Sequence, residues 1–105
     1  MNIGIDMAYI PRFIDKEKLA LKILSLNELE EYKKSDLKAT YLASRFCLKE
    51  AFIKSIEGNI LAFDLKEIEV VKKESGAVGI LYQSKMYKCS LSHEKEYTVG
   101  VVIYD

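Results

Sequence analysis

The periodicity of the apolar residues changes at Gly58, and this change constrains the fold more than any other feature of the sequence. Before Gly58 the apolar residues recur at helical spacing, and after it they follow strand patterns separated by short polar turns. Residues 2–10 (NIGIDMAYI) form an earlier strand pattern, which Pro11 ends. One strand, then helices, then four closely connected strands predict an α+β fold with an antiparallel sheet.

The boundaries of the expected elements follow from cap residues and turns. Ser25 and Glu28 form a capping box at the start of the second helix. Ser35 or Asp36 can cap the third and longest helix, which Gly58 closes. We expect this helix to pack across one face of a small sheet, beside the shorter helices. The expected helices cover about residues 14–24, 26–34 and 37–57, and the later strands cover 67–73, 78–83, 86–92 and 97–104.

The length of 105 residues predicts a single domain over residues 1–105. Half of the residues are hydrophobic, although a chain of this size buries only about 60–70% of its unfolded surface. Burial between subunits would use this apolar surface, and so would a tight, aromatic-rich monomer core. The composition leaves both alternatives open.

The charge distribution argues against a nucleic-acid-binding protein, because 16 basic and 16 acidic residues give no basic excess. The charge is nevertheless uneven along the chain. Residues 37–56 carry a local charge of +3, from four cations and Glu50, whereas residues 23–36 and 57–75 are each −2. The predicted long helix is therefore the basic part of a neutral protein.

The cellular compartment is expected to be the cytoplasm. No apolar run approaches the length of a membrane span, and the acidic start of the chain does not favour a signal peptide, so no membrane contact is expected. Cys47 and Cys89 lack the spacing of metal ligands. We expect both to be buried thiols in a reducing compartment.

Glu50 interrupts the apolar face of the long helix. Phe46 and Ile53 lie about one turn before and after it. Because an unpaired buried charge is very costly, Glu50 must be paired or must hold a metal. The simplest expectation is an i, i+4 ion pair with Lys54, worth about 0.3–0.5 kcal/mol when exposed.

Asp6 is a second isolated carboxylate, in the apolar strand IGIDMAYI. It either caps a neighbouring element or binds a ligand. Two such carboxylates suit Mg²⁺ that holds a phosphate, because Mg²⁺ uses one or two carboxylates with phosphate oxygens and water. Arg45, Lys49 and Lys54 could meet the remaining phosphate charge.

Three segments resemble the holo-[acyl-carrier-protein] synthase family of 4′-phosphopantetheinyl transferases. These are the opening strand IGIDMAYIPRF, the central YLASRFCLKEAFIKSIEG and the closing CSLSHEKEYTVGVVI. They occur in the family's order, and the central segment is the most specific. The chain departs from the family in three places. Tyr9 stands where the family often has a glutamate, and the turn after the central segment is shortened to EGNILAF. Residues 76–78 are GAV, where the family usually has Gly-x-Pro.

The resemblance implies a role for several residues of this chain. Asp6 and Glu50 match the aspartate and glutamate that hold Mg²⁺ against the coenzyme A pyrophosphate, and Glu50 and Lys54 would be catalytic. Arg45 and His93 match positions that contact the nucleotide, and Arg12 matches a position that docks the acyl carrier protein. The implied cofactor-binding set is Arg45, Lys49, Lys54, Ser92 and His93. The expected partner-binding set is Arg12, Lys16, Lys18 and Lys22. The three lysines of the second set are included because of their charge alone.

The implied reaction moves the 4′-phosphopantetheine group from coenzyme A to a serine of apo acyl carrier protein. It depends on Mg²⁺ and releases 3′,5′-ADP, with Glu50 or a metal-bound water as the base. The family forms trimers with active sites between subunits, which fits the high apolar content. The alternative is a catalytically degenerate module that binds the carrier protein or a nucleotide without transfer.

Overall fold

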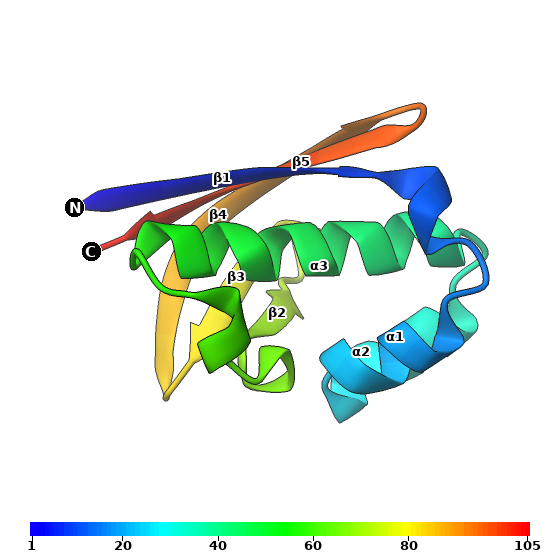
Figure 1. Ribbon diagram of the computed structural model, residues 1–105, viewed down its shortest axis with the longest axis horizontal. Helices are drawn as coiled ribbons and strands as arrows, with labels where there is room; N and C mark the ends of the chain where they lie inside the picture. Colours follow the sequence, from blue (N-terminus) through cyan, green and yellow to red (C-terminus); the bar gives the residue numbers. More distant parts are fainter.

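The computed structural model describes all residues from 1 to 105 as one antiparallel sheet with three α-helices (Figure 1). The strand order is β1-β5-β4-β3-β2, so the first and last strands of the chain are neighbours. No helix is long and apolar enough to span a membrane. The strands are β1 (Asn2–Tyr9), β2 (Glu69–Lys72), β3 (Val78–Tyr82), β4 (Lys85–Glu94) and β5 (Tyr97–Tyr104), and the helices are α1 (Glu17–Ile23), α2 (Leu26–Lys34) and α3 (Lys38–Ser55).

The predicted α+β fold and the order of its elements are confirmed. The predicted capping box of α2 is also present, with Ser25 and Glu28 each bonded to the other's backbone N–H. The predicted first helix starts too early, at residue 14, since Asp15 has a φ of 55° and a short 3-10 turn, Ile10–Phe13, precedes it. Helix α1 therefore begins only at Glu17.

The ends of α3 differ from the prediction. The Oγ of Ser35 accepts a hydrogen bond from the N–H of Leu37, so no side chain caps the helix. At the other end Glu57, with a φ of 55°, adopts the left-handed conformation. The N–H of Gly58 then donates to the carbonyl oxygen of Ile53, and the last turn is closed in the manner of a Schellman motif.

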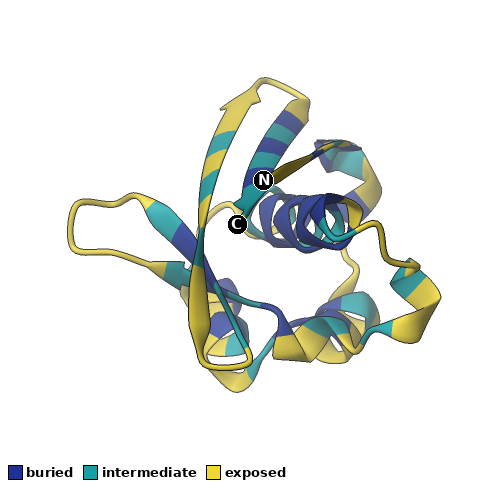
Figure 2. Ribbon diagram, turned by 90° about the vertical axis from the view of Figure 1, so that its left-hand side faces the viewer, coloured by how far each residue is buried: buried dark blue, intermediate teal, exposed yellow.

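Helix α3 lies directly on β1 and β5 because both strands carry a glycine at the contact. A Cβ atom on Gly4 would lie 1.9 Å from the carbonyl oxygen of Ala51, and one on Gly100 would lie 2.8 Å from Leu48. Figure 2 shows α3 as the most completely buried element, enclosed by the sheet and the shorter helices. This close approach brings the inner face of β1 to the functional residues of α3.

The outer face of β1 is apolar and exposed. Ile3, Ile5 and Met7 are 64%, 59% and 62% exposed, on the side of the sheet away from α3. Their register partners on β5 are Ile103, Val101 and Val99. Strand geometry puts these three residues on one face, and this face is uncovered in the single chain.

Candidate active site

Asp6 and Lys54 form an ion pair between β1 and α3. The Nζ of Lys54 donates to Oδ1 of Asp6 at 2.8 Å and to the carbonyl oxygen of Ile5 at 3.2 Å. The hydrogen bond to Asp6 raises the pKa of Lys54. The expected i, i+4 pair between Glu50 and Lys54 is absent, because β1 places Asp6 closer to the lysine.

Glu50 lies half-buried beside this pair. Burial, and then the charge of Asp6, raise its pKa to about 7, while Lys54 lowers it. Glu50 and Lys54 share a hollow of about 370 Å³ at the C-terminal end of α3, here called the acid–lysine hollow. Its other lining residues are Ile53, Gly58, Asn59 and Ile60. Near pH 7 such a carboxyl group is divided between its protonated and ionised forms, and a further cation would favour the ionised form.

The donor set of Asp6 and Glu50 fits Mg²⁺ better than a metal held by protein alone. No group of three or more His, Cys, Asp or Glu side chains occurs that could hold a metal ion. Two adjacent carboxylates leave most coordination positions to other oxygens, as is usual for Mg²⁺ with a phosphorylated substrate. Burial, and then repulsion by Asp6, raise the pKa of Glu50, and a bound cation would relieve the repulsion.

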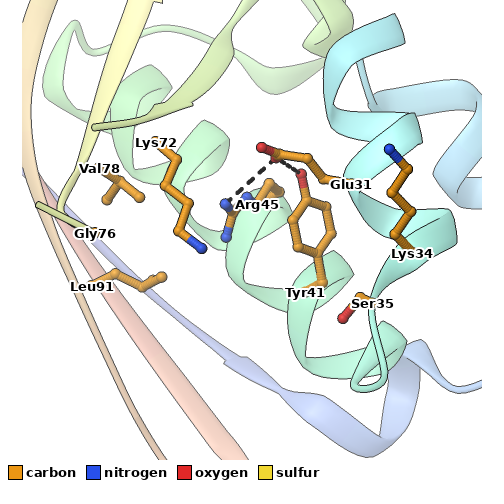
Figure 3. A pocket seen from close by; sticks show the side chains of 9 residues that line it. All are labelled: Glu31, Lys34, Ser35, Tyr41, Arg45, Lys72, Gly76, Val78 and Leu91. Carbon is orange, nitrogen blue, oxygen red and sulfur yellow. Dashed lines mark hydrogen bonds and ion pairs between the residues drawn. The ribbon is translucent and has the colours of Figure 1, made fainter. Parts of the chain in front are cut away.

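A second cavity, of about 500 Å³, surrounds Arg45 on another side of α3 (Figure 3). Its lining includes three cations and one carboxylate, a net charge of +2. We call it the arginine cavity. It is lined by Glu31, Lys34, Ser35, Tyr41, Arg45, Lys72, Gly76, Val78 and Leu91.

Arg45 is buried beside this cavity, but few of its N–H donors have a hydrogen-bond partner. Its guanidinium lies over the ring of Tyr41, with the carbon 4.1 Å from the centroid, and one nitrogen donates to Oγ of Ser44 at 3.1 Å. A second nitrogen is 3.9 Å from a carboxylate oxygen of Glu31, beyond hydrogen-bonding distance, and the Nε has no partner. A buried arginine with unused donors is suited to receive an anion.

The arginine cavity and the acid–lysine hollow lie on different sides of α3. Arg45 and Glu50 are five residues apart, which corresponds to about 140° around a helix. The two sites share no lining residue. The structure therefore does not bring Arg45 together with Asp6, Glu50 and Lys54 in one site of a single chain.

Lys49 has a structural role in place of the predicted contact with phosphate. Its Nζ is completely buried and donates to Oε1 of Glu28 at 2.7 Å, and to the carbonyl oxygens of Ile23 and Leu65 at 2.9 and 2.7 Å. All three ammonium protons are thus used. Glu28 in turn accepts from the N–H of Val70, so the pair joins α1, α2, α3 and β2.

Ser92 and His93 lie exposed near the end of β4, and neither lines the arginine cavity of its own chain. Ser92 is opposite Val99 on the outer face of the sheet, whereas His93 is opposite the buried Thr98 on the inner face. Their predicted nucleotide contacts are therefore not assembled within one chain.

The predicted partner-binding cations form an exposed set at the start of the helical region. Arg12 lies in the 3-10 turn, 5.8 Å from the ring centroid of Tyr9. Lys16, which precedes the first residue of α1, and Lys18 and Lys22 on α1 are all exposed. Lys22 also borders an apolar hollow of about 390 Å³ that includes Phe46. Sequence reasoning did not identify this hollow, because segments far apart in the chain build it. For the same reason it did not identify three residues of the arginine cavity, Glu31, Lys34 and Lys72.

The fold and these sites define an α+β protein suited to bind a phosphorylated ligand through carboxylates, lysines and a buried arginine. The model of the 4′-phosphopantetheinyl transferase superfamily matches residues 2–102, and the chain belongs to this family. The holo-[acyl-carrier-protein] synthase of Mycoplasmopsis pulmonis is 37% identical over 101 residues, covering 95% of this chain and 86% of the relative. The resemblance seen in the three segments is confirmed.

Two solved structures share both the fold and part of the sequence. A holo-(acyl-carrier-protein) synthase of Bacillus anthracis, in complex with CoA (3′,5′-ADP), has a TM-score of 0.86 at 29% identity, with 96% of this chain and 92% of that chain covered. The Helicobacter pylori holo-[acyl-carrier-protein] synthase, in complex with coenzyme A, has a TM-score of 0.85 at 26% identity, with 98% and 99% covered.

Proposed function

We propose that the protein transfers the 4′-phosphopantetheine group of coenzyme A to a serine of apo acyl carrier protein, with Mg²⁺, and releases 3′,5′-ADP. Family membership and the coenzyme A complexes of two relatives support this reaction. The observation that carries it is the group formed by Asp6, Glu50 and Lys54, where β1 crosses α3. We place the reaction in the cytoplasm, as the sequence predicts.

The chemistry follows from the charges of this group. Asp6 and Glu50 would hold Mg²⁺, which when bound neutralises charge on the pyrophosphate of coenzyme A. Lys54, which already spans from Asp6 towards the hollow of Glu50, stabilises the phosphate oxygens and the leaving group. The serine oxygen bonds to the β-phosphorus, and the bond from that phosphorus to the 3′,5′-ADP oxygen breaks. Glu50 or a water molecule accepts the serine proton.

The nucleotide end of coenzyme A is assigned to the arginine cavity. The guanidinium of Arg45, which makes a single hydrogen bond and lies 3.9 Å from Glu31, and the ammonium group of Lys72 supply donors for a phosphate. The ring of Tyr41 backs the guanidinium and fixes its plane. A nucleotide phosphate would satisfy the donors that the protein leaves unused.

A homotrimer with active sites between subunits is part of the proposal. The exposed apolar face of β1, with the partly buried apolar residues of β5 beside it, gives one chain a surface to bury against another. The two halves of the site lie on different sides of α3, so contact between copies is a way to unite them. It would also give Ser92 and His93, which lie outside their own arginine cavity, a place beside a neighbour's nucleotide.

Docking of the carrier protein is assigned to Arg12, Lys16, Lys18 and Lys22. All four are exposed at one end of the molecule, near the apolar hollow that Lys22 borders. Exposed cations beside an apolar hollow suit an acidic partner that also buries apolar side chains.

The direct test is the mass of an apo acyl carrier protein after incubation with the protein, coenzyme A and Mg²⁺. A gain of one phosphopantetheine group, lost with EDTA and with Asp6→Asn or Glu50→Gln, supports the transferase. Folded protein that binds the carrier but transfers nothing would favour the degenerate module. Full activity of either variant would contradict the assignment of Asp6 and Glu50 as metal ligands.

A further inference from the structure

The arginine cavity contains an internal anion, Glu31, at the place where a phosphate would bind. Glu31 is the one carboxylate among the lining residues, and its Oε1 lies 3.9 Å from a nitrogen of the Arg45 guanidinium. The hydroxyl of Tyr41 donates to that same oxygen and keeps the carboxylate turned towards the arginine (Figure 3). Tyr41 also lies against the guanidinium face, so the three side chains form one cluster.

The contact with Glu31 partly offsets the charge of Arg45 but does not complete its hydrogen bonds. At 3.9 Å the carboxylate is too distant for a hydrogen bond, and the Nε of the buried guanidinium remains unpartnered. The side chain of Glu31 is 44% exposed, whereas that of Arg45 is 9% exposed. The carboxylate can therefore turn out to solvent, while the arginine stays in place.

We propose that Glu31 competes with the nucleotide phosphate for Arg45 and thereby lowers the affinity of the site for coenzyme A and 3′,5′-ADP. This inference rests on the proposed function, which assigns the nucleotide to the arginine cavity. A bound phosphate and the Glu31 carboxylate would carry like charges against the same guanidinium, so one must move for the other to bind. When the product leaves, Glu31 returns to Arg45 and restores its partial neutralisation.

The test compares E31Q with a matched control, E30Q. Both variants remove one negative charge from α2, but the exposed Glu30 does not line the arginine cavity. Calorimetric titration with 3′,5′-ADP should show about two- to fivefold tighter binding by E31Q, the range expected for a partly exposed ion pair, and a smaller change for E30Q. Y41F, which keeps the ring but removes the hydroxyl that holds Glu31, should shift the affinity in the same direction.

A second readout does not depend on any nucleotide. The chain contains only two arginines, Arg12 and Arg45, so their Nε–Hε signals in a nitrogen-15 spectrum can be assigned with one R12K variant. In the ligand-free protein, E31Q should shift the Arg45 signal and E30Q should leave it in place.

Three results would be decisive against the inference or its basis. Weaker binding by E31Q would make Glu31 a ligand of the nucleotide and overturn the competition. An unchanged affinity and an unchanged Arg45 signal in E31Q would overturn it as well. Failure of the wild-type protein to bind 3′,5′-ADP would instead overturn the proposed nucleotide site, which is a different result from binding that Glu31 does not affect.

Discussion

Gly4 of β1 lies against the main chain of Ala51 in α3, so close that an added Cβ would be 1.9 Å from the Ala51 carbonyl oxygen. This contact fixes where Asp6, two residues further along β1, meets α3. We expect Gly4→Ala to destabilise the protein by about 3 kcal/mol, since neither backbone can move freely. Chemical denaturation measures the change. Gly79→Ala is the control, because the only close contact of its methyl group would be with the flexible end of Met86, and an equal loss there would show that the backbone contact of Gly4 is not the cause.

The buried pair of Lys49 and Glu28 should matter for stability far more than the exposed end of the Asp6–Lys54 pair. Removing one partner leaves a charge buried without its counterion, so Lys49→Met should cost about 3–5 kcal/mol. The ammonium group of Lys54 is on a side chain that is 56% exposed, and Lys54→Met should cost at most about 1 kcal/mol. Denaturation of both variants checks this ranking. A stable Lys49→Met variant with weaker coenzyme A binding would restore the phosphate contact predicted from the sequence.

The error at Lys49 shows where sequence reasoning reaches its limit. The helical spacing placed Lys49 and Lys54 on α3 correctly. Spacing within α3 alone does not reveal that Glu28 of α2 lies in the core and pairs with Lys49. The apolar periodicity predicted the fold because the helices and the later strands bury apolar side chains in the core, and only β1 leaves its more apolar side exposed. The arginine cavity could not be predicted, since α2, α3, β2, β3 and β4 each supply only one or a few of its residues.

Cys89 should be slow to react with alkylating reagents in the folded protein. Burial raises the pKa of its thiol from 9.0 to about 11. At pH 8 the thiolate fraction falls by about 100-fold, so iodoacetamide should modify the folded C47A variant at least about 100-fold more slowly than the unfolded one. Folding raises the pKa of the Cys89 thiol, so the protonated thiol favours the folded state. This contribution to the free energy of unfolding is complete below pH 9 and is lost as the pH rises towards 11. Equal rates in both states would contradict it.

A charge on the outer face of β1 should disrupt the proposed trimer. Ile5 is 59% exposed in the single chain and lies opposite Val101 in the middle of the apolar face. We expect Ile5→Lys to sediment as a smaller species than the wild type while it keeps its helical circular dichroism. Leu26→Lys, at an 85% exposed position on α2, is the control and should sediment as the wild type does. A monomeric wild type, or a trimeric Ile5→Lys variant, would rule out this face as the interface.

We propose that Arg45 and Glu50, which face different sides of one helix, belong to two halves of an active site shared between copies. A complementation assay can decide this: two weakly active variants, Arg45→Ala and Glu50→Gln, are refolded together, and transfer to apo acyl carrier protein is recorded. Random mixing would make about one interface in four carry both intact halves, so about a quarter of the wild-type rate should return. If the mixture stays as inactive as its components, the two residues do not act across subunits, and the shared site is wrong.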